Sequence, residues 1–233
     1  MTSTKKIIKK KLKEPDEFIT LTERAYLFVT HHGRSIAMGT GIVLVLLLAI
    51  FLFQKWDKRN EGKAYQMLTS IIETYQMISS PYREGSPQEY KNVLERFNEM
   101  VAKFPGTSSG KLAVLYKGNI HLRLGEFDEA IKAFESYLAK AGKEKLYRAF
   151  AMEGLGYSYE GKRDYEKAVD AYQKLIDLGE SFQLANAHFG MGRCYEKMGK
   201  TREALEHYRS FISVSPKSQM ANIVLRKISN LEK

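Results

Sequence analysis

The sequence predicts an all-α protein in which one membrane-spanning helix is followed by a solenoid of helical hairpins. Two observations lead to this fold class: an uncharged apolar segment near the N-terminus, and a residue pattern that recurs every 36 to 38 positions. The segments that we expect are a basic tail (1–34), a membrane anchor (35–56), a linker helix with a degenerate hairpin (57–106), three clear hairpins (107–216) and a capping helix (217–233).

The predicted anchor is the stretch from Ser35 to Gln54, which carries no charged residue. A helix of this length is about 30 Å long, which matches the hydrocarbon core of a bilayer. Trp56 follows, where an aromatic ring would lie at the headgroup level. A cleaved signal peptide would begin nearer the N-terminus and have a shorter apolar run. A core helix that is apolar on every side is rare in a domain this small, so we expect a retained anchor.

The orientation of the anchor follows from the flanking basic residues. Residues 1–34 contain eight Lys and Arg, whereas the ten residues after Gln54 contain four: Lys55, Lys58, Arg59 and Lys63. This bias favours a cytoplasmic N-terminus and a C-terminal domain outside the cytoplasm, which would be the periplasm of a Gram-negative cell. The expected location is therefore the bacterial inner membrane. The reverse topology, a receptor with cytosolic repeats, stays open as an alternative.

The tail before the anchor has two features. The basic run from Lys5 to Lys13 would be attracted to anionic lipids. Residues 15–32 are typical of a short helix, with one face formed by Phe18, Leu21, Ala25 and Phe28. This helix would either lie in the membrane interface or bind a partner.

The repeated pattern consists of a glycine, an alanine twelve residues later and an aromatic residue four positions further. Its three occurrences are Gly118, Ala130 and Phe134; Gly156, Ala168 and Tyr172; and Gly192, Ala204 and Tyr208. This register resembles the 34-residue tetratricopeptide repeat, in which each unit is a helix–turn–helix hairpin. We expect these residues to pack helices together, and Gly125 and Gly199 to end the first helix of their hairpins.

Less regular segments flank the three hairpins. Residues 56–77 predict a long amphipathic helix, and Val93, Phe97, Met100 and Pro105 match the second half of a degenerate hairpin, interrupted by the loop at 79–87. Beyond Pro216, an apolar stripe predicts the capping helix that an exposed end of a solenoid requires. It consists of Met220, Ile223, Val224, Ile228 and Leu231.

Stacked hairpins form a concave groove that the first helix of each hairpin lines. Protein partners are the expected ligands, and aromatic and arginine side chains most often anchor such contacts. The candidate partner-binding residues are Leu115, Asn119, Arg123, Glu153, Tyr157, Phe189, Arg193 and Lys197. Repeat proteins that clamp the C-terminal carboxylate of cytosolic chaperones have a lysine where Leu115 stands, which argues against that function.

Other classes of function are disfavoured. The repeats (residues 104–216) carry 17 basic and 15 acidic residues, so a basic face for nucleic acid is not expected. No phosphate loop or nucleophile motif is present, which predicts a protein that is not an enzyme and takes no cofactor or small-molecule substrate. His31 and His32 are adjacent and Cys194 is the single cysteine, so neither a metal site nor a disulfide within the chain is expected.

The stretch Phe28-Val29-Thr30-His31-His32-Gly33-Arg34 leads directly into the anchor. Together with a basic tail, one anchor and about four repeats, it resembles the ancillary subunit of the bacterial Sec translocon. The resemblance implies a periplasmic domain that contacts translocon subunits, exported proteins or envelope chaperones. Our hypothesis is thus a non-catalytic scaffold that assists protein export or folding. The alternative is a structural component of a cell-envelope or secretion assembly.

Overall fold

The computed structural model describes residues 17–80, 82–140, 142, 144–179 and 181–233, with the backbone alone for residues 17–21, 181 and 182. The chain divides into two compact units, residues 1–56 and 57–233. Apart from two strands of two residues each, every regular element in the described residues is a helix, which confirms the all-α prediction. The basic run from Lys5 to Lys13 and the side chains of Phe18 and Leu21 lie outside the described parts of the chain.

The first unit contains the N-terminal part of helix α1 (Glu17–Ile78). The most apolar 18-residue window of this helix has a mean hydropathy of 2.8, and none of that window is buried. The helix is therefore long and apolar enough to cross a membrane. The Thr40 hydroxyl donates to the carbonyl oxygen of Ile36 at 2.8 Å, so this polar group is satisfied within the apolar segment.

Helix α1 differs from the sequence-based expectation in its continuity. The sequence predicts a short helix at 15–32, an anchor and an amphipathic helix at 56–77, whereas the structure joins the described parts of all three in α1. The physical reason is that no proline lies between Pro15 and Pro81, so every residue between them can donate its backbone N–H to the helix.

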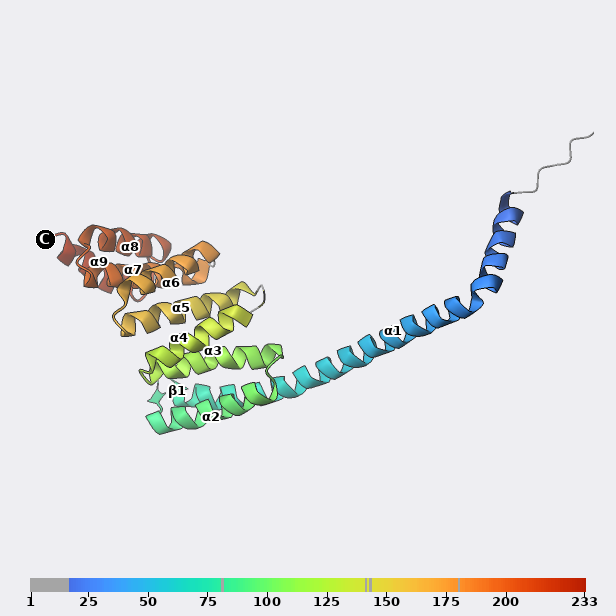
Figure 1. Cartoon of the computed structure of the whole chain (residues 1–233). Coiled ribbons are helices and arrows are strands. Elements are labelled where there is room, and N and C mark those ends of the chain that lie inside the picture. The colour runs from blue at the N-terminus through green and yellow to red at the C-terminus, as the bar shows by residue number, and fades with distance from the viewer. Residues whose placement is uncertain (1–16, 81, 141, 143, 180) are drawn as a thin grey trace, which may run out of the picture. The chain divides into compact units, whose positions relative to one another are not determined.

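The second unit is a stack of helical hairpins (Figure 1). The end of α1 pairs with α2 to form the degenerate hairpin, three regular hairpins follow, and α9 closes the stack. This arrangement confirms the prediction of three clear repeats, one degenerate repeat and a capping helix. The elements are α2 (Pro87–Lys103), α3 (Ser108–Arg123), α4 (Phe127–Lys140), α5 (Lys145–Gly161), α6 (Tyr165–Leu178), α7 (Ser181–Lys197), α8 (Thr201–Val214) and α9 (Ala221–Leu231).

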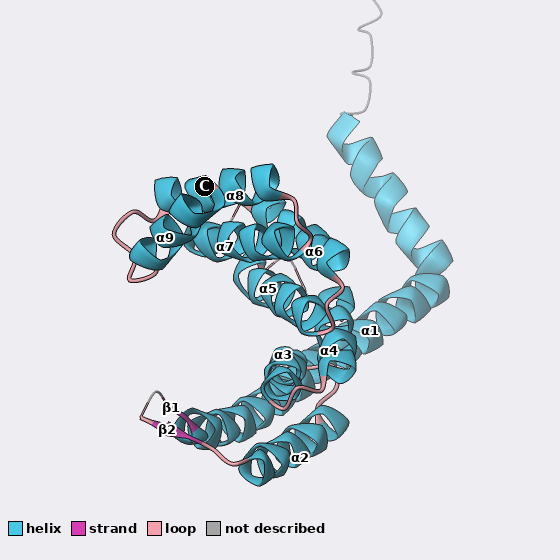
Figure 2. Cartoon of the chain, turned by 90° about the vertical axis from the view of Figure 1, so that its left-hand side faces the viewer, coloured by secondary structure: helices cyan, strands magenta, loops and turns pink. Residues whose placement is uncertain are grey.

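The loop that interrupts the degenerate hairpin contains the two short strands (Figure 2). Strand β1 (Ser79–Ser80) pairs antiparallel with β2 (Arg83–Glu84). Helix α2 then begins with a capping box, in which the Ser86 side chain and the Glu89 side chain each bond the backbone N–H of the other residue. The capping box thus fixes where the second helix of this hairpin starts.

The core runs along the stack as a series of apolar clusters at the junctions between successive helices. One cluster joins α1, α2 and α3 through residues such as Ile71, Phe97 and Ile120, each fully buried. The last cluster joins α7, α8 and α9, where Val224 is buried. Of the stripe expected on the capping helix, Ile223 instead lies outward, with 38% of its surface exposed.

In the first two regular hairpins, an aromatic side chain from the second helix is held between two glycines. Phe134 of α4 contacts Gly118 of its own hairpin and Gly154 of the next, and Tyr172 repeats this arrangement with Gly156 and Gly190. A Cβ atom on Gly118 would lie 2.6 Å from the Phe134 ring, which is closer than van der Waals contact allows. Both glycines are therefore required for the ring to fit.

The turns within the hairpins use the left-handed backbone region. Gly125 and Gly199 have φ angles of 74° and 73°, as expected for residues that end a helix. In the second hairpin the same position is Arg163, with φ of 63°. A residue with a Cβ atom is strained in this conformation, so the second turn is less favourable than the other two.

A carboxylate from α1 caps α3 across 47 residues of sequence. Glu61 accepts hydrogen bonds from the backbone N–H groups of Ser108 and Ser109, at 2.7 and 3.0 Å, and from the Ser109 hydroxyl at 2.6 Å. Burial opposes ionisation of Glu61, but these hydrogen bonds outweigh it and lower the pKa of the carboxyl group. The degenerate hairpin is thereby fastened to the first regular one.

Candidate partner-binding groove

The groove candidates come from the first helices of the three regular hairpins, α3, α5 and α7. The structure brings four of them together where α5 packs beside α7: Glu153, Tyr157, Phe189 and Arg193. These side chains are half-buried, and most of their polar atoms already have partners within the chain. Their contacts decide what surface remains for a ligand.

Arg193 is the centre of this group. Its Nε and Nη2 atoms donate to the two carboxylate oxygens of Glu160 at 3.0 and 2.6 Å, and Glu160 also accepts from the Tyr172 hydroxyl at 2.5 Å. Burial opposes the charge of Arg193, but the hydrogen bonds to Glu160 outweigh it and raise the pKa of the guanidinium group. The arginine is therefore always charged and is neutralised within the protein.

Two aromatic rings lie against the same guanidinium group. The central carbon of Arg193 is 4.7 Å from the centroid of the Phe189 ring and 5.6 Å from that of Tyr157, both within cation–π distance. Burial raises the pKa of Tyr157 to about 12, so its hydroxyl stays protonated. Phe189 also packs on Phe211 of α8, with ring centroids 5.7 Å apart.

Glu153 forms a second polar cluster one turn earlier. It accepts hydrogen bonds from Gln183 Nε2 at 2.7 Å, Asn186 Nδ2 at 2.8 Å and the Tyr157 hydroxyl at 3.2 Å. Gln183 is only 2% exposed, and its Oε1 atom accepts from none of the described residues. Asn186 is exposed, so the amide of this residue can also meet a ligand.

The three candidates on α3 occupy different environments. Leu115 is 3% exposed and packs with Ala151 and Leu155, so it lies in the core and not on the groove surface as expected. The reason is that α5 crosses over this face of α3. Asn119 is half-buried, and the exposed Arg123 points towards the degenerate hairpin, with its guanidinium carbon 5.8 Å from the Tyr90 ring centroid.

The remaining candidate, Lys197, is exposed near the end of α7. The groove positions whose polar side chains a partner can reach are thus Asn119, Arg123, Asn186 and Lys197. Sequence reasoning missed Gln183, because it lies before the repeat positions used to define the groove. It also left out the role of Glu160, since the arginine that pairs with it is 33 residues away.

The described residues of this surface include neither a cluster of metal ligands nor a reactive thiol. No cluster of three or more metal-ligating side chains occurs within the described residues. Cys194 is buried, and burial raises the pKa of its thiol to about 12, which keeps it protonated and unreactive. The site therefore offers hydrogen-bonding groups, aromatic rings and charge, held in place by contacts between neighbouring hairpins.

Hairpins of this size that stack through repeated glycine–aromatic contacts define a helical-repeat solenoid, a class of protein-binding scaffolds. The sequence profile of the tetratricopeptide repeat-like domain matches residues 27–233. The chain belongs to this family. A search of curated proteins finds no significant match.

Several solved structures share the fold. The structure of MamA aligns with a TM-score of 0.54 at 18% identity, over 72% of this chain and 83% of MamA. MamA from Desulfovibrio magneticus RS-1 gives 0.54 at 19% identity, covering 67% and 77% of the two chains. A tetratricopeptide repeat protein from Parabacteroides merdae gives 0.55 at 20% identity, covering 72% and 60%. Identities this low establish the fold alone.

Proposed function

We propose that this protein is a non-catalytic scaffold, anchored by residues 35–56 in the bacterial inner membrane, that binds protein partners through the groove of its repeats. The observation that carries this proposal is the contact network of Glu153, Tyr157, Phe189 and Arg193, which holds the side chains of two successive first helices in a fixed arrangement. Preorganised aromatic and arginine side chains bordered by reachable polar groups are typical of protein-binding surfaces.

We further propose that the repeats lie in the periplasm and serve protein export or folding near the Sec translocon. The excess of basic residues before the anchor supports this orientation. The resemblance of the 28–34 stretch and of the overall arrangement to the ancillary translocon subunit supports the role. Translocon subunits, exported proteins and envelope chaperones are the partners that follow.

Site-specific photocrosslinking in cells tests the groove. A photoreactive residue replaces Asn119, Asn186 or Lys197 in the full-length protein, because these side chains are at least partly exposed. Lys132, on the exposed surface of α4, is the matched control. We expect the three groove positions to give the same crosslinked partners and Lys132 to give none of them. Equal products from all four positions would show that the groove is not the binding surface.

Two further measurements test the finer proposal. Crosslinks to translocon subunits and to varied exported proteins would support a role in export, whereas one fixed partner would support the alternative of a structural component. Protease added from the periplasmic side should degrade residues 57–233. If it leaves them intact, the repeats lie in the cytoplasm and the proposed orientation is wrong.

A further inference from the structure

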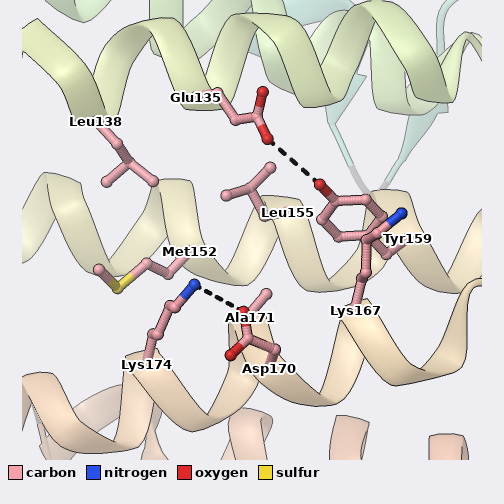
Figure 3. Close-up of a pocket in the computed structure, with 9 residues that line it drawn as sticks. All are labelled: Glu135, Leu138, Met152, Leu155, Tyr159, Lys167, Asp170, Ala171 and Lys174. Carbon is pink, nitrogen blue, oxygen red and sulfur yellow. Dashed lines mark hydrogen bonds and ion pairs between the residues drawn. The ribbon is translucent and has the colours of Figure 1, made fainter.

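A cavity of about 260 Å³ lies between α4, α5 and α6 (Figure 3). None of the eight groove candidates lines it. Its apolar lining consists of Leu138 from α4, Met152 and Leu155 from α5, and Ala171 from α6, and the Tyr159 ring closes one end. This volume is close to that of one large side chain and is smaller than most sites for whole small molecules.

The next hairpin explains why the cavity exists. A shift of 36 residues places His188 where Met152 stands, Tyr195 where Tyr159 stands and His207 where Ala171 stands. In the third hairpin the His207 ring lies beside both His188 and Tyr195, with its centroid 5.4 Å from each of theirs, whereas the second hairpin has only a methyl group at the matching position. The cavity is therefore the space that an aromatic ring occupies one repeat later.

The ring in the third hairpin is also stacked. The rings of His207 and Tyr195 are 5.4 Å apart between centroids and inclined by 13°, which is a nearly parallel arrangement. In the second hairpin Tyr159 is held in a fixed orientation, because its hydroxyl donates to Glu135 at 3.3 Å. Lys167 lies against the same ring, with Nζ 5.6 Å from the centroid. Because Tyr159 lines the cavity, a second flat ring inserted there can stack on it.

We propose that this cavity receives one aromatic side chain of a partner protein, stacked against Tyr159 in the way that His207 stacks against Tyr195. The rim favours a polypeptide over a free aromatic molecule, because it carries both carboxylate groups that accept hydrogen bonds and an ammonium group that donates them. Glu135 lies on one side, and the Lys174 ammonium group is paired with Asp170 at 2.6 Å on the other. These groups can bond the peptide N–H and C=O groups that flank an inserted side chain.

This surface is independent of the groove. It is lined by the second helices α4 and α6 together with part of α5, whereas the groove candidates lie on α3, α5 and α7. A partner that inserts a ring here can therefore bind at the same time as a groove ligand. Two moderate contacts on one scaffold act together if a single partner makes both.

Methyl NMR of the full-length protein in detergent micelles tests the proposal. The probes are the pentapeptide Ac-Ala-Ala-Trp-Ala-Ala-NH2, its leucine counterpart and 3-methylindole, which is the tryptophan side chain without peptide groups. The reporter is the methyl group of Met152, assigned with Met152→Leu. We expect the tryptophan peptide to shift the Met152 signal saturably at millimolar concentration and to bind at least about fivefold more tightly than the leucine peptide or 3-methylindole.

Ala171→His should block the site, because it places in the second hairpin the ring that the third hairpin already has. We expect affinity for the tryptophan peptide to fall by about tenfold or more. The same substitution at exposed Ala102 on α2 is the matched control and should leave binding unchanged. Tyr159→Leu, which keeps an apolar side chain but removes the stacking face, should weaken binding even if Ala171→His perturbs folding.

Three results would overturn the proposal. An unshifted Met152 signal would show that the cavity does not bind the ring. Equal affinity for the leucine peptide would show that stacking on Tyr159 plays no part. Equal affinity for 3-methylindole would show that the site takes a free aromatic molecule and that the flanking peptide groups play no part.

Discussion

Arg193 of α7 and Glu160 of α5 form a two-pronged ion pair between successive hairpins, with N–O distances of 3.0 and 2.6 Å. A similar connection follows one repeat later, where Lys227 of α9 donates to Glu196 of α7 at 2.8 Å. In the second and third hairpins a tyrosine of the second helix donates to the same carboxylate: Tyr172 to Glu160 and Tyr208 to Glu196. These networks set the register of one hairpin on the next.

Glu160→Gln should lower the free energy of unfolding by about 2 kcal/mol, because it leaves the guanidinium group of Arg193 without its counter-charge. The pair is mostly buried, with 28% of the Arg193 side chain and 18% of the Glu160 side chain exposed. Chemical unfolding of the purified protein measures the change. The exposed pair of Lys132 and Glu129 is the control, and Glu129→Gln should have no measurable effect. Equal losses in both variants would contradict a special role for Glu160.

Gly154→Ala should destabilise the stack by about 2 kcal/mol, since the new methyl group would collide with the Phe134 ring. Gly62→Ala is a matched control, because nothing lies within 4 Å of a Cβ at that helical position. The control should be neutral or should gain about 0.5–1 kcal/mol from the better helix propensity of alanine. Thermal unfolding followed by circular dichroism measures the stability of both variants. An equal loss of stability in Gly62→Ala would show that the collision with Phe134 is not what destabilises Gly154→Ala.

Arg163→Gly should stabilise the protein by about 0.5–1 kcal/mol. The substitution removes the strain of a Cβ atom at φ of 63°, although glycine loses more conformational entropy on folding. Gly199→Ala makes the reverse change at the equivalent turn, with φ of 73°, and should destabilise by a similar amount. The midpoints of denaturant unfolding give both values. A lower midpoint for Arg163→Gly would mean that the contacts of the arginine side chain stabilise the fold by more than the backbone strain destabilises it.

The stability of the third hairpin should fall in mildly acidic solution. His188 and His207 have their Nδ1 atoms 3.1 Å apart, so one imidazole must donate and the other accept, which two imidazolium ions cannot do. Burial lowers the pKa of both imidazoles. The positive charge of His207 lowers the pKa of His188 further, whereas the negative charge of Glu206 partly offsets the lowering for His207. The folded pair therefore binds fewer protons than the unfolded chain, whose imidazoles titrate at about 6.5.

The contribution of the pair is complete above about pH 6.5 and is lost as the pH falls from that value towards the lowered pKa values of the folded state. The double variant His188→Met, His207→Ala carries the residues that the second hairpin has at these positions, Met152 and Ala171. Between about pH 7.5 and pH 5.5, the wild-type melting temperature should drop more than that of the variant. Equal drops would show that other groups cause the acid sensitivity.

Periodicity in the sequence was sufficient to predict the hairpins because packing requires particular residues at each junction. Gly118, Gly156 and Gly192 recur because a ring of the second helix lies against each of them. Gly154 and Gly190 complete the contacts of Phe134 and Tyr172 from the following hairpin, and these two glycines were not recognised as part of the pattern. A glycine is needed at these positions because the ring of the preceding hairpin packs against them, and this contact is visible only in the folded stack.

The groove was only partly predictable. Positions within a repeat identified Tyr157, Phe189 and Arg193, and these side chains do lie together. The same rule placed Leu115 on the surface, although the crossing of α5 over α3 buries it. Whether any of the candidates binds a partner stays a prediction, because binding depends on a second molecule as well as on the fold.

The sequence by itself determined the long apolar helix and the repeating hairpins, since both arise from local patterns: a run of apolar residues, a glycine–alanine–aromatic register and glycines at turns. The tertiary structure decided which charged side chains pair and where space remains. Arg193 pairs with Glu160, and Ala171 lines a cavity where the third hairpin has the His207 ring, only because neighbouring hairpins stack in one register. Such contacts join residues about 30 positions apart, and a pattern within one helix cannot specify them.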